Sequence, residues 1–120
     1  MVKLFAFLYR REGMTHDEFI DHWRHRHGPL IAGSESLSSH IVRYIQHPRL
    51  HSGPLSGTVG CDGVTEQWFE SIDDFAGFIA DPEYATLIAP DEQRFLDMSK
   101  VTFVCCDEPL LVIGGEIDGE

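Results

Sequence analysis

A histidine at the end of an amphipathic stretch is the best candidate for acid–base chemistry in this sequence. Counting 100° per residue along a helix places four side chains in one stripe of about 100°: Phe19, Ile20, Trp23 and His27. His27 therefore faces inward, beside aromatic rings, where Gly28-Pro29 is expected to end the helix. Because imidazole exchanges protons near neutral pH without a cofactor, His27 is predicted to be a general acid or base. The alternative is that His27 caps the helix by bonding a backbone carbonyl.

A carboxylate is expected beside aromatic surface on the strand over residues 64–69. Glu66 shares one strand face with Val64 and Trp68, because side chains in a strand alternate between faces. Burial there would raise the pKa of Glu66 and suit it to catalysis as an acid or base. An ion pair with Arg43 or Arg94 is an equally well supported interpretation.

Three more polar side chains also have two interpretations each. Tyr44 and Gln46 share a face of the preceding strand and are predicted to orient a substrate carbonyl or hydroxyl, with Tyr44 counted as catalytic. A tyrosine on a strand commonly packs with its hydroxyl already bonded, which is the alternative here. The favoured interpretation of Asp91 is a helix N-cap, and the alternative interpretation is an acid in a pocket.

Aromatic side chains supply enough apolar surface for a hydrophobic pocket, although most of that surface must form the core. We therefore expect only some of these rings to touch a ligand. The predicted substrate-binding set joins them to Gln46 and Asp91, and its aromatic members are Phe5, Phe7, Trp23, Trp68, Phe78 and Phe95.

Histidines also crowd positions 22–27, which raises the question of a metal site. His22 and His25 are three residues apart, a spacing at which two imidazoles on a helix can reach one ion. Arg24 and Arg26 would repel a cation, however, and no second ligand cluster has matching spacing. The sequence therefore predicts no metal, no haem and no other cofactor.

The elements that must position these side chains follow from local patterns. Thr15 and Glu18 form a capping box that starts the first helix, and Ser71 caps a second one that Asp81-Pro82 interrupts. A long connection rich in Gly and Pro spans residues 47–63. Four strands are expected, over residues 3–9, 41–46, 64–69 and 100–106. A further helical piece is expected over residues 91–98. Residues 107–120 are expected to form an edge strand or a tail, with 110–113 as the possible fifth strand.

This order, β-α-β-β-α-β, predicts an α+β protein with the ferredoxin-like fold, built as a single domain over residues 1–120. One face of the sheet takes both helices. The other face stays uncovered, and an apolar sheet surface of that size normally mediates association. We therefore expect two chains to pack sheet to sheet as a homodimeric α/β barrel.

Charge limits the classes of partner. The formal net charge is −11, with 20 acidic residues against 9 Lys and Arg, so a phosphate backbone or an anionic membrane surface would be repelled. No apolar run approaches the roughly 20 residues needed to cross a bilayer. The expectation is a cytoplasmic protein that binds a hydrophobic small molecule and neither nucleic acid nor membrane.

Several short motifs, in order over most of the chain, resemble the EthD family. They are Lys3-Leu4, Arg10-Arg11-x-Gly13, Phe19-x-x-x-Trp23-x-x-x-His27-Gly28-Pro29, Tyr44-x-Gln46, Asp62-Gly63-Val64-x-Glu66-x-Trp68-Phe69 and Asp91-Glu92-x-x-Phe95-x-Asp97. The resemblance implies a dimeric α/β barrel and a role in breaking down or tailoring hydrophobic small molecules. It does not fix one reaction, because this and neighbouring families include cofactor-free lyases, decarboxylases, lactone isomerases, cyclases and monooxygenases.

The favoured hypothesis is a cofactor-independent lyase or isomerase that uses His27 on a hydrophobic cyclic or aromatic metabolite. The reaction would be an elimination, decarboxylation, cyclisation or lactone isomerisation. The alternative is a non-catalytic accessory protein that holds such a ligand for an oxidative degradation pathway.

Overall fold

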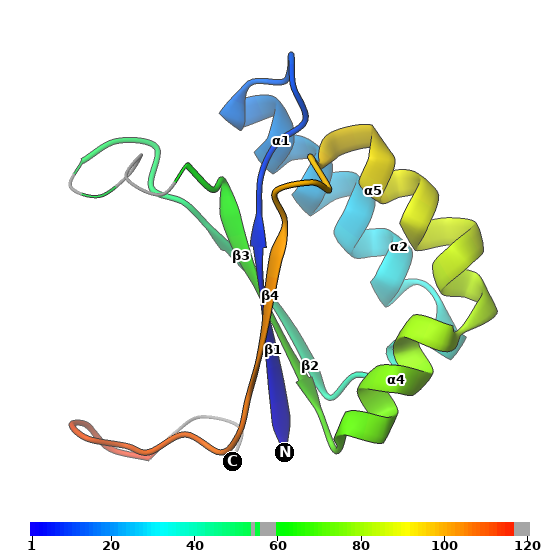
Figure 1. The fold of residues 1–120 in the computed structure, drawn as a ribbon, viewed down its shortest axis with the longest axis vertical. Coiled ribbons are helices and arrows are strands. Elements are labelled where there is room, and N and C mark those ends of the chain that lie inside the picture. Colours follow the sequence, from blue (N-terminus) through cyan, green and yellow to red (C-terminus); the bar gives the residue numbers. More distant parts are fainter. Residues whose placement is uncertain (54, 56–59, 117–120) are drawn as a thin grey trace.

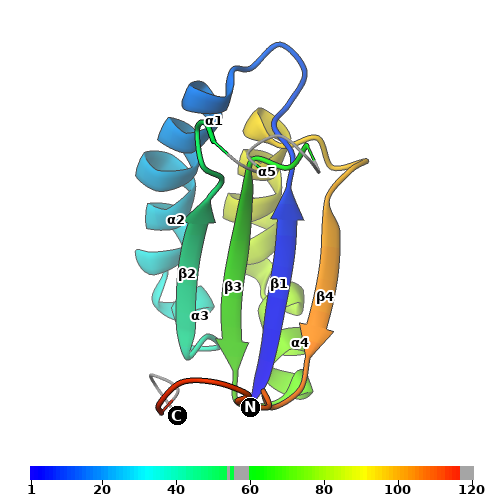
Figure 2. The same cartoon turned by 90° about the vertical axis from the view of Figure 1, so that its left-hand side faces the viewer.

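The computed structural model describes residues 1–53, 55 and 60–116. It contains one antiparallel sheet with the strand order β2-β3-β1-β4. The strands are β1 (Val2–Leu8), β2 (Arg43–Pro48), β3 (Gly63–Phe69) and β4 (Thr102–Cys106). The helices of the described residues lie against one face of this sheet (Figure 1), and none of them covers the opposite face (Figure 2). The predicted ferredoxin-like α+β arrangement is confirmed.

The first helical run is longer than the sequence indicated. It comprises α1 (His16–His22), a π-helical segment η1 (Trp23–His27) and α2 (Gly28–Ala32), and it starts with the predicted Thr15–Glu18 capping box. Gly28-Pro29 does not end the helix as expected. Gly28 N–H bonds the carbonyl five residues back, at Trp23, and Pro29 falls in the first turn of α2, where a missing N–H costs little.

The second helical run repeats this arrangement. It comprises α4 (Ile72–Ala80), a π-helical segment η2 (Tyr84–Ile88) and α5 (Ala89–Phe95), with a proline again in the first turn after the π segment. Ser71 caps α4, and the extended backbone of Asp81 interrupts the run, both as predicted. Asp91 does not occupy the N-cap position, because α5 starts at Ala89 and the N-cap residue is Ile88.

The other boundaries differ from the predictions by small amounts. A short helix, α3 (Glu35–Ser38), precedes β2 and begins at Ser34, whose hydroxyl accepts the Leu37 N–H. The predicted connection over 47–63 lies partly outside the described residues. The fifth strand considered at Leu110–Ile113 does not form, because residues 107–116 are irregular and these apolar side chains are exposed.

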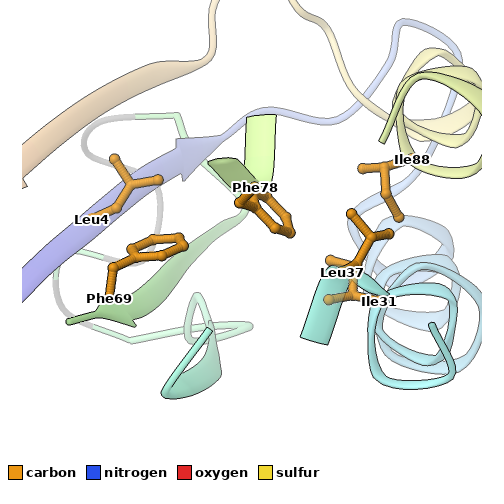
Figure 3. Close-up of a cluster of buried hydrophobic side chains, with 6 residues drawn as sticks. All are labelled: Leu4, Ile31, Leu37, Phe69, Phe78 and Ile88. Atoms are coloured by element: carbon orange, nitrogen blue, oxygen red, sulfur yellow. The ribbon is translucent and has the colours of Figure 1, made fainter. Parts of the chain in front are cut away.

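The core fills the space between the sheet and the helices. One cluster joins β1 and β3 to α2, α3, α4 and η2 through Leu4, Ile31, Leu37, Phe69, Phe78 and Ile88 (Figure 3). A second cluster lies toward the other end of β1 and includes Phe19, Trp23 and Phe95, all fully buried. Trp23 packs directly on Gly63, where a Cβ atom would come within 2.5 Å of the indole ring. Glycine at the start of β3 therefore allows the π segment to approach the sheet.

Candidate active site

A cavity of about 460 Å³ lies between the two core clusters, on the helix-covered face of the sheet. This size is within the range of small-molecule sites. Its walls are mostly apolar and come from β1, β3, β4 and both helical runs, with Leu4, Ile31, Phe75, Phe78, Ile88 and Phe103 among them. Six side chains bring polar atoms to these walls: His27, Tyr44, Thr65, Gln67, Tyr84 and Glu92.

His27, at the last position of η1, is held by a carboxylate from the other helical run. Its Nδ1 lies 2.8 Å from Oδ2 of Asp91, and His22 Nε2 lies 2.9 Å from Oδ1 of the same group. Burial opposes ionisation of Asp91, but the hydrogen bonds from His27 and His22 outweigh it and lower its pKa. An ionised carboxylate only accepts hydrogen bonds, so the facing nitrogen of each ring carries a hydrogen and donates it.

The protonation state of His27 follows from the same geometry. Burial lowers the pKa of His27, although the hydrogen bond and negative charge of Asp91 act in the opposite direction. The ring is therefore favoured in its neutral form. Because Nδ1 carries the hydrogen, Nε2 is the basic nitrogen of this wall residue. His27 has the electronic form that a general base requires.

Phe95 fixes the positions of both imidazoles. Its ring stacks on His22 at a centroid distance of 4.6 Å and lies 4.9 Å from the His27 ring at a tilted angle. Phe95 and Asp91 are four residues apart on α5, so they lie on one face of this helix. One helix face therefore supplies both the hydrogen-bond acceptor and the packing surface for His27.

A second acid–base pair lies along the second helical run. The hydroxyl of Tyr84 donates to Glu92, with distances of 3.1 and 3.0 Å to the two carboxylate oxygens. Burial raises the pKa of Glu92 despite the Tyr84 hydrogen bond, and the negative charge of Asp91 adds to the shift. Burial also raises the pKa of Tyr84. Glu92 is therefore easier to protonate than an ordinary carboxylate and can donate a proton.

On the sheet side, Tyr44 and Gln46 occupy one face of β2, as predicted. Gln46 Nε2 donates to the carbonyl of Trp23 at 2.9 Å and to the Tyr44 hydroxyl at 3.2 Å. Burial raises the pKa of Tyr44, so its hydroxyl stays protonated. Gln46 thus ties β2 to the π segment, while Tyr44 is one of the residues that line the cavity.

The structure separates Glu66 from the other predicted catalytic residues. Glu66 and Trp68 alternate with the wall residues Thr65 and Gln67 along β3, so they point to the uncovered face. The Glu66 carboxylate accepts hydrogen bonds from His47, at 2.9 Å, and from Trp68 Nε1. These bonds outweigh the effect of burial and lower the pKa of Glu66. The expected raised pKa is therefore wrong, as is grouping Glu66 with His27 in one site.

Phe5 and Phe7 lie on the same uncovered face, because they alternate with the wall residues Leu4, Ala6 and Leu8 of β1. They are not among the residues that line the cavity. Trp68 is covered there by Lys3, whose Nζ lies 4.3 Å from the ring centroid, and by Arg43. Arg94, one of the two predicted ion-pair partners of Glu66, lies instead within 3.4 Å of Asp91, and Arg43 lies over the Trp68 ring.

The remaining predicted site residues either line the cavity or lie behind the residues that line it. Phe78 lines the cavity together with His27 and Tyr44. Trp23 is fully buried behind the wall, and Asp91 and Phe95 contact His27 from behind.

Four polar wall residues were missed by the sequence analysis: Thr65, Gln67, Tyr84 and Glu92. For the two on β3, a signal was present in the alternation of the strand, which places Thr65 and Gln67 together on the face opposite Glu66. Tyr84 and Glu92 lie eight residues apart on one helical run, a separation that keeps two side chains within one stripe of about 100°.

Within residues 1–53, 55 and 60–116, no helix has the length and apolar character to cross a bilayer. Over the same ranges, no three His, Cys, Asp or Glu side chains are grouped so that they could hold a metal ion.

These features define the class: an α+β protein of ferredoxin-like fold with a largely apolar cavity, one buried acid–base pair and one half-buried acid–base pair. The family model described as "EthD domain" matches residues 11–99, and the chain belongs to this family.

Two curated relatives extend this result. The conidial pigment biosynthesis dehydratase EthD of Metarhizium robertsii is 29% identical over 104 residues, which cover 78% of this chain and 72% of the relative. The dehydratase ustZ of Ustilaginoidea virens is 22% identical over 120 residues, which cover 92% of this chain and 86% of the relative.

Solved structures share the fold. An EthD family protein from Bacillus halodurans superposes with a TM-score of 0.67 at 17% identity, covering 91% of this chain and 99% of that one. A dimeric protein of ferredoxin-like fold from Bacteroides fragilis has a TM-score of 0.61 at 14% identity, covering 89% and 95% of the two chains.

Proposed function

We propose that this protein is a cofactor-independent dehydratase that removes water from a hydrophobic cyclic hydroxy compound. The observation that carries the proposal is the hydrogen bond between His27 Nδ1 and the buried, ionised Asp91, with the ring at the wall of a largely apolar cavity. The names of the two curated relatives, both dehydratases, agree with this class of reaction.

In the proposed reaction a β-hydroxy ketone loses a C–H bond and a C–O bond and gains a C=C bond. His27 Nε2 takes the proton from the carbon next to the carbonyl, and the electron pair forms an enolate. The Tyr44 hydroxyl, which is kept neutral by burial, donates to the enolate oxygen. Collapse of the enolate expels the hydroxyl, which leaves as water after taking a proton from Glu92.

Asp91 and His22 are proposed to position the base. Asp91 holds His27 in the tautomer with Nε2 unprotonated and stabilises the positive ring that forms after proton transfer. His22 bonds the other oxygen of Asp91 and limits its rotation. After each turnover His27 loses its proton and Glu92 regains one by exchange with solvent, so the net reaction releases only water.

The test uses 3-hydroxy-1-tetralone, a bicyclic β-hydroxy ketone whose dehydration gives 1-naphthol. The wild type is expected to accelerate the appearance of naphthol fluorescence over the uncatalysed rate. His27→Gln should lower this rate by about 100-fold or more, the usual contribution of a general base. The matched control is His25→Gln, because His25 lies in the same segment but is exposed.

Either of two results would count against the proposal. Equal rates for the wild type and His27→Gln would remove His27 from the chemistry. Binding of the tetralone without any conversion would favour an accessory, ligand-holding role instead.

We also propose that two chains pack through their uncovered sheet faces. This face presents aliphatic and aromatic side chains from all four strands, including Phe5, Phe7, Ile45, Val64 and Val104, and Val104 is 44% exposed. An apolar sheet face of this kind is normally covered by another surface. The dimeric state given for the protein of the same fold from Bacteroides fragilis supports the proposal.

A further inference from the structure

Gln67, a residue of the cavity wall, has an unsatisfied hydrogen-bond acceptor. Its side chain is on the helix-covered face of β3, opposite Leu4 of β1 and Tyr44 of β2, which are also wall residues. The residue is 9% exposed, and its Oε1 is buried without a hydrogen-bond partner. In folded proteins most buried polar atoms are paired, so an unpaired acceptor at a cavity wall points to a bound group.

Three other polar wall residues already have a hydrogen-bond partner within the protein. His27 Nδ1 donates to Asp91, the Tyr84 hydroxyl donates to Glu92, and the Tyr44 hydroxyl accepts from Gln46. Among the described residues that line the cavity, Gln67 has a side-chain acceptor atom, Oε1, that is buried without a hydrogen-bond partner. The residue Gln67 lines a cavity of about 460 Å³, which is large enough to admit a partner. The missing partner can therefore come from a ligand.

We propose that Gln67 selects ligands that carry a hydroxyl or other hydrogen-bond donor on an otherwise apolar ring system. The walls around it supply apolar contact from Leu4, Phe78 and Ile88, so the rest of the ligand is hydrocarbon in character. An acceptor-only group at this position would face the lone pairs of Oε1 and be repelled.

Leaving Oε1 unpaired destabilises the folded protein without ligand, and a site built to bond a hydroxyl rejects an analogue that lacks it. Replacing Gln67 by an apolar side chain of similar size therefore has two opposite effects. The unliganded protein becomes more stable, or at least no less stable, while the preference for a donor disappears. A residue with a purely structural role would lose stability and leave the preference unchanged.

The experiment measures the dissociation constants of three naphthalene probes by equilibrium dialysis against the full chain. 2-Naphthol carries a donor, 2-methoxynaphthalene carries an acceptor alone, and 2-methylnaphthalene supplies the apolar reference. The ratio of Kd for 2-methylnaphthalene to Kd for 2-naphthol is compared between the wild type and Gln67→Leu, so differences in water solubility cancel. This ratio should fall roughly tenfold to a hundredfold in Gln67→Leu.

Gln93→Leu is the matched control, because Gln93 is an exposed glutamine on α5 that is not among the residues lining the cavity. Its ratio should stay within about twofold of the wild type, well below the change expected from losing the Gln67 acceptor. Gln67→Met provides a second variant should Gln67→Leu fail to fold. A ratio unchanged in both Gln67 variants, or equal binding of 2-naphthol and 2-methoxynaphthalene by the wild type, would overturn the inference.

The inference rests on the proposed function in taking this cavity as the substrate site, but its test measures binding and needs no turnover. If the preference is present and 3-hydroxy-1-tetralone is not dehydrated, the dehydratase proposal fails and the role of Gln67 stands. If the tetralone is dehydrated and the ratio does not change in the Gln67 variants, the dehydratase proposal stands and the role proposed for Gln67 fails.

Discussion

His27 Nδ1 and Asp91 Oδ2 are 2.8 Å apart, although 64 residues separate the two positions in the sequence. Both residues lie close to a π-helical segment that precedes a proline. His27 is the last residue of η1, before Gly28-Pro29, and Asp91 comes three residues after the end of η2, next to Pro90. π segments rotate the side chains that follow them relative to an uninterrupted α-helix, and they occur often at functional sites. The two irregular turns therefore bring a base and its partner together between the helical runs.

Asp91→Asn is expected to reduce the turnover of 3-hydroxy-1-tetralone by about 100-fold, because His27 would lose the negative charge that fixes its tautomer and stabilises its protonated form. Steady-state kinetics should show the loss mainly in kcat, since Asp91 is behind the wall and does not line the cavity. Circular dichroism of the variant checks that the fold is kept. A variant with unchanged kcat would exclude Asp91 from the mechanism.

The lowered pKa of His27 predicts a loss of stability in acid. Unfolded histidine titrates near 6.5, whereas folded His27 titrates below this value, so between the two pKa values the unfolded chain binds a proton that the native protein does not. The stability of the native protein that depends on a neutral His27 ring is therefore intact above pH 6.5, and it is lost as pH falls toward the pKa of folded His27. Between the two pKa values the free energy of unfolding falls by at most about 1.4 kcal/mol for each pH unit.

Urea unfolding at pH 7.5, 6.5 and 5.5, at one protein concentration, can measure this effect. The free energy of unfolding of the wild type minus that of His27→Gln should decrease as pH falls, because the variant lacks the titrating ring. His25→Gln again serves as the control, since His25 is exposed. A difference that stays constant or increases toward pH 5.5 would show that the folded pKa of His27 is not depressed.

Two carboxylates on opposite faces of the sheet give a matched pair of substitutions. Glu92→Gln removes the proposed acid at the cavity wall and should lower turnover by about 100-fold. Glu66→Gln removes a carboxylate on the uncovered face, where it is bonded to His47 and Trp68, and should leave turnover within about threefold of the wild type. Comparison of the two kcat values decides which face carries the chemistry. Equal losses would contradict the assignment.

Much of the fold was predictable because the signals for it are local. Thr15 with Glu18 and Ser71 mark helix starts through hydrogen bonds to neighbouring N–H groups, and Asp81 marks a break. The strand order along the chain followed from alternating and apolar runs. The continuation of the first helix past Pro29 was not predicted, because a π turn depends on packing around Trp23 and leaves no simple pattern in sequence.

The site was predictable only in part, because it depends on which face of each strand meets the helices. β1 is apolar on both faces, so its sequence does not distinguish the Phe5 face from the Leu4 face. Glu66 and Trp68 resemble pocket residues as much as Thr65 and Gln67 do. The contact of His27 with Asp91 was not predicted either, since it depends on how the two helical runs pack across 64 residues of chain.

The last prediction concerns the uncovered sheet face. Val104 lies on β4, where the register places it opposite Phe5, and it is 44% exposed. If this face is the interface between two chains, Val104→Arg buries an unpaired charge in an apolar contact and should convert the dimer to a monomer. Ile72→Arg is the matched control, because Ile72 is 54% exposed at the start of α4, in the helix layer. Analytical ultracentrifugation should show a monomer for Val104→Arg alone; two dimeric variants, or a monomeric wild type, would exclude this face as the interface.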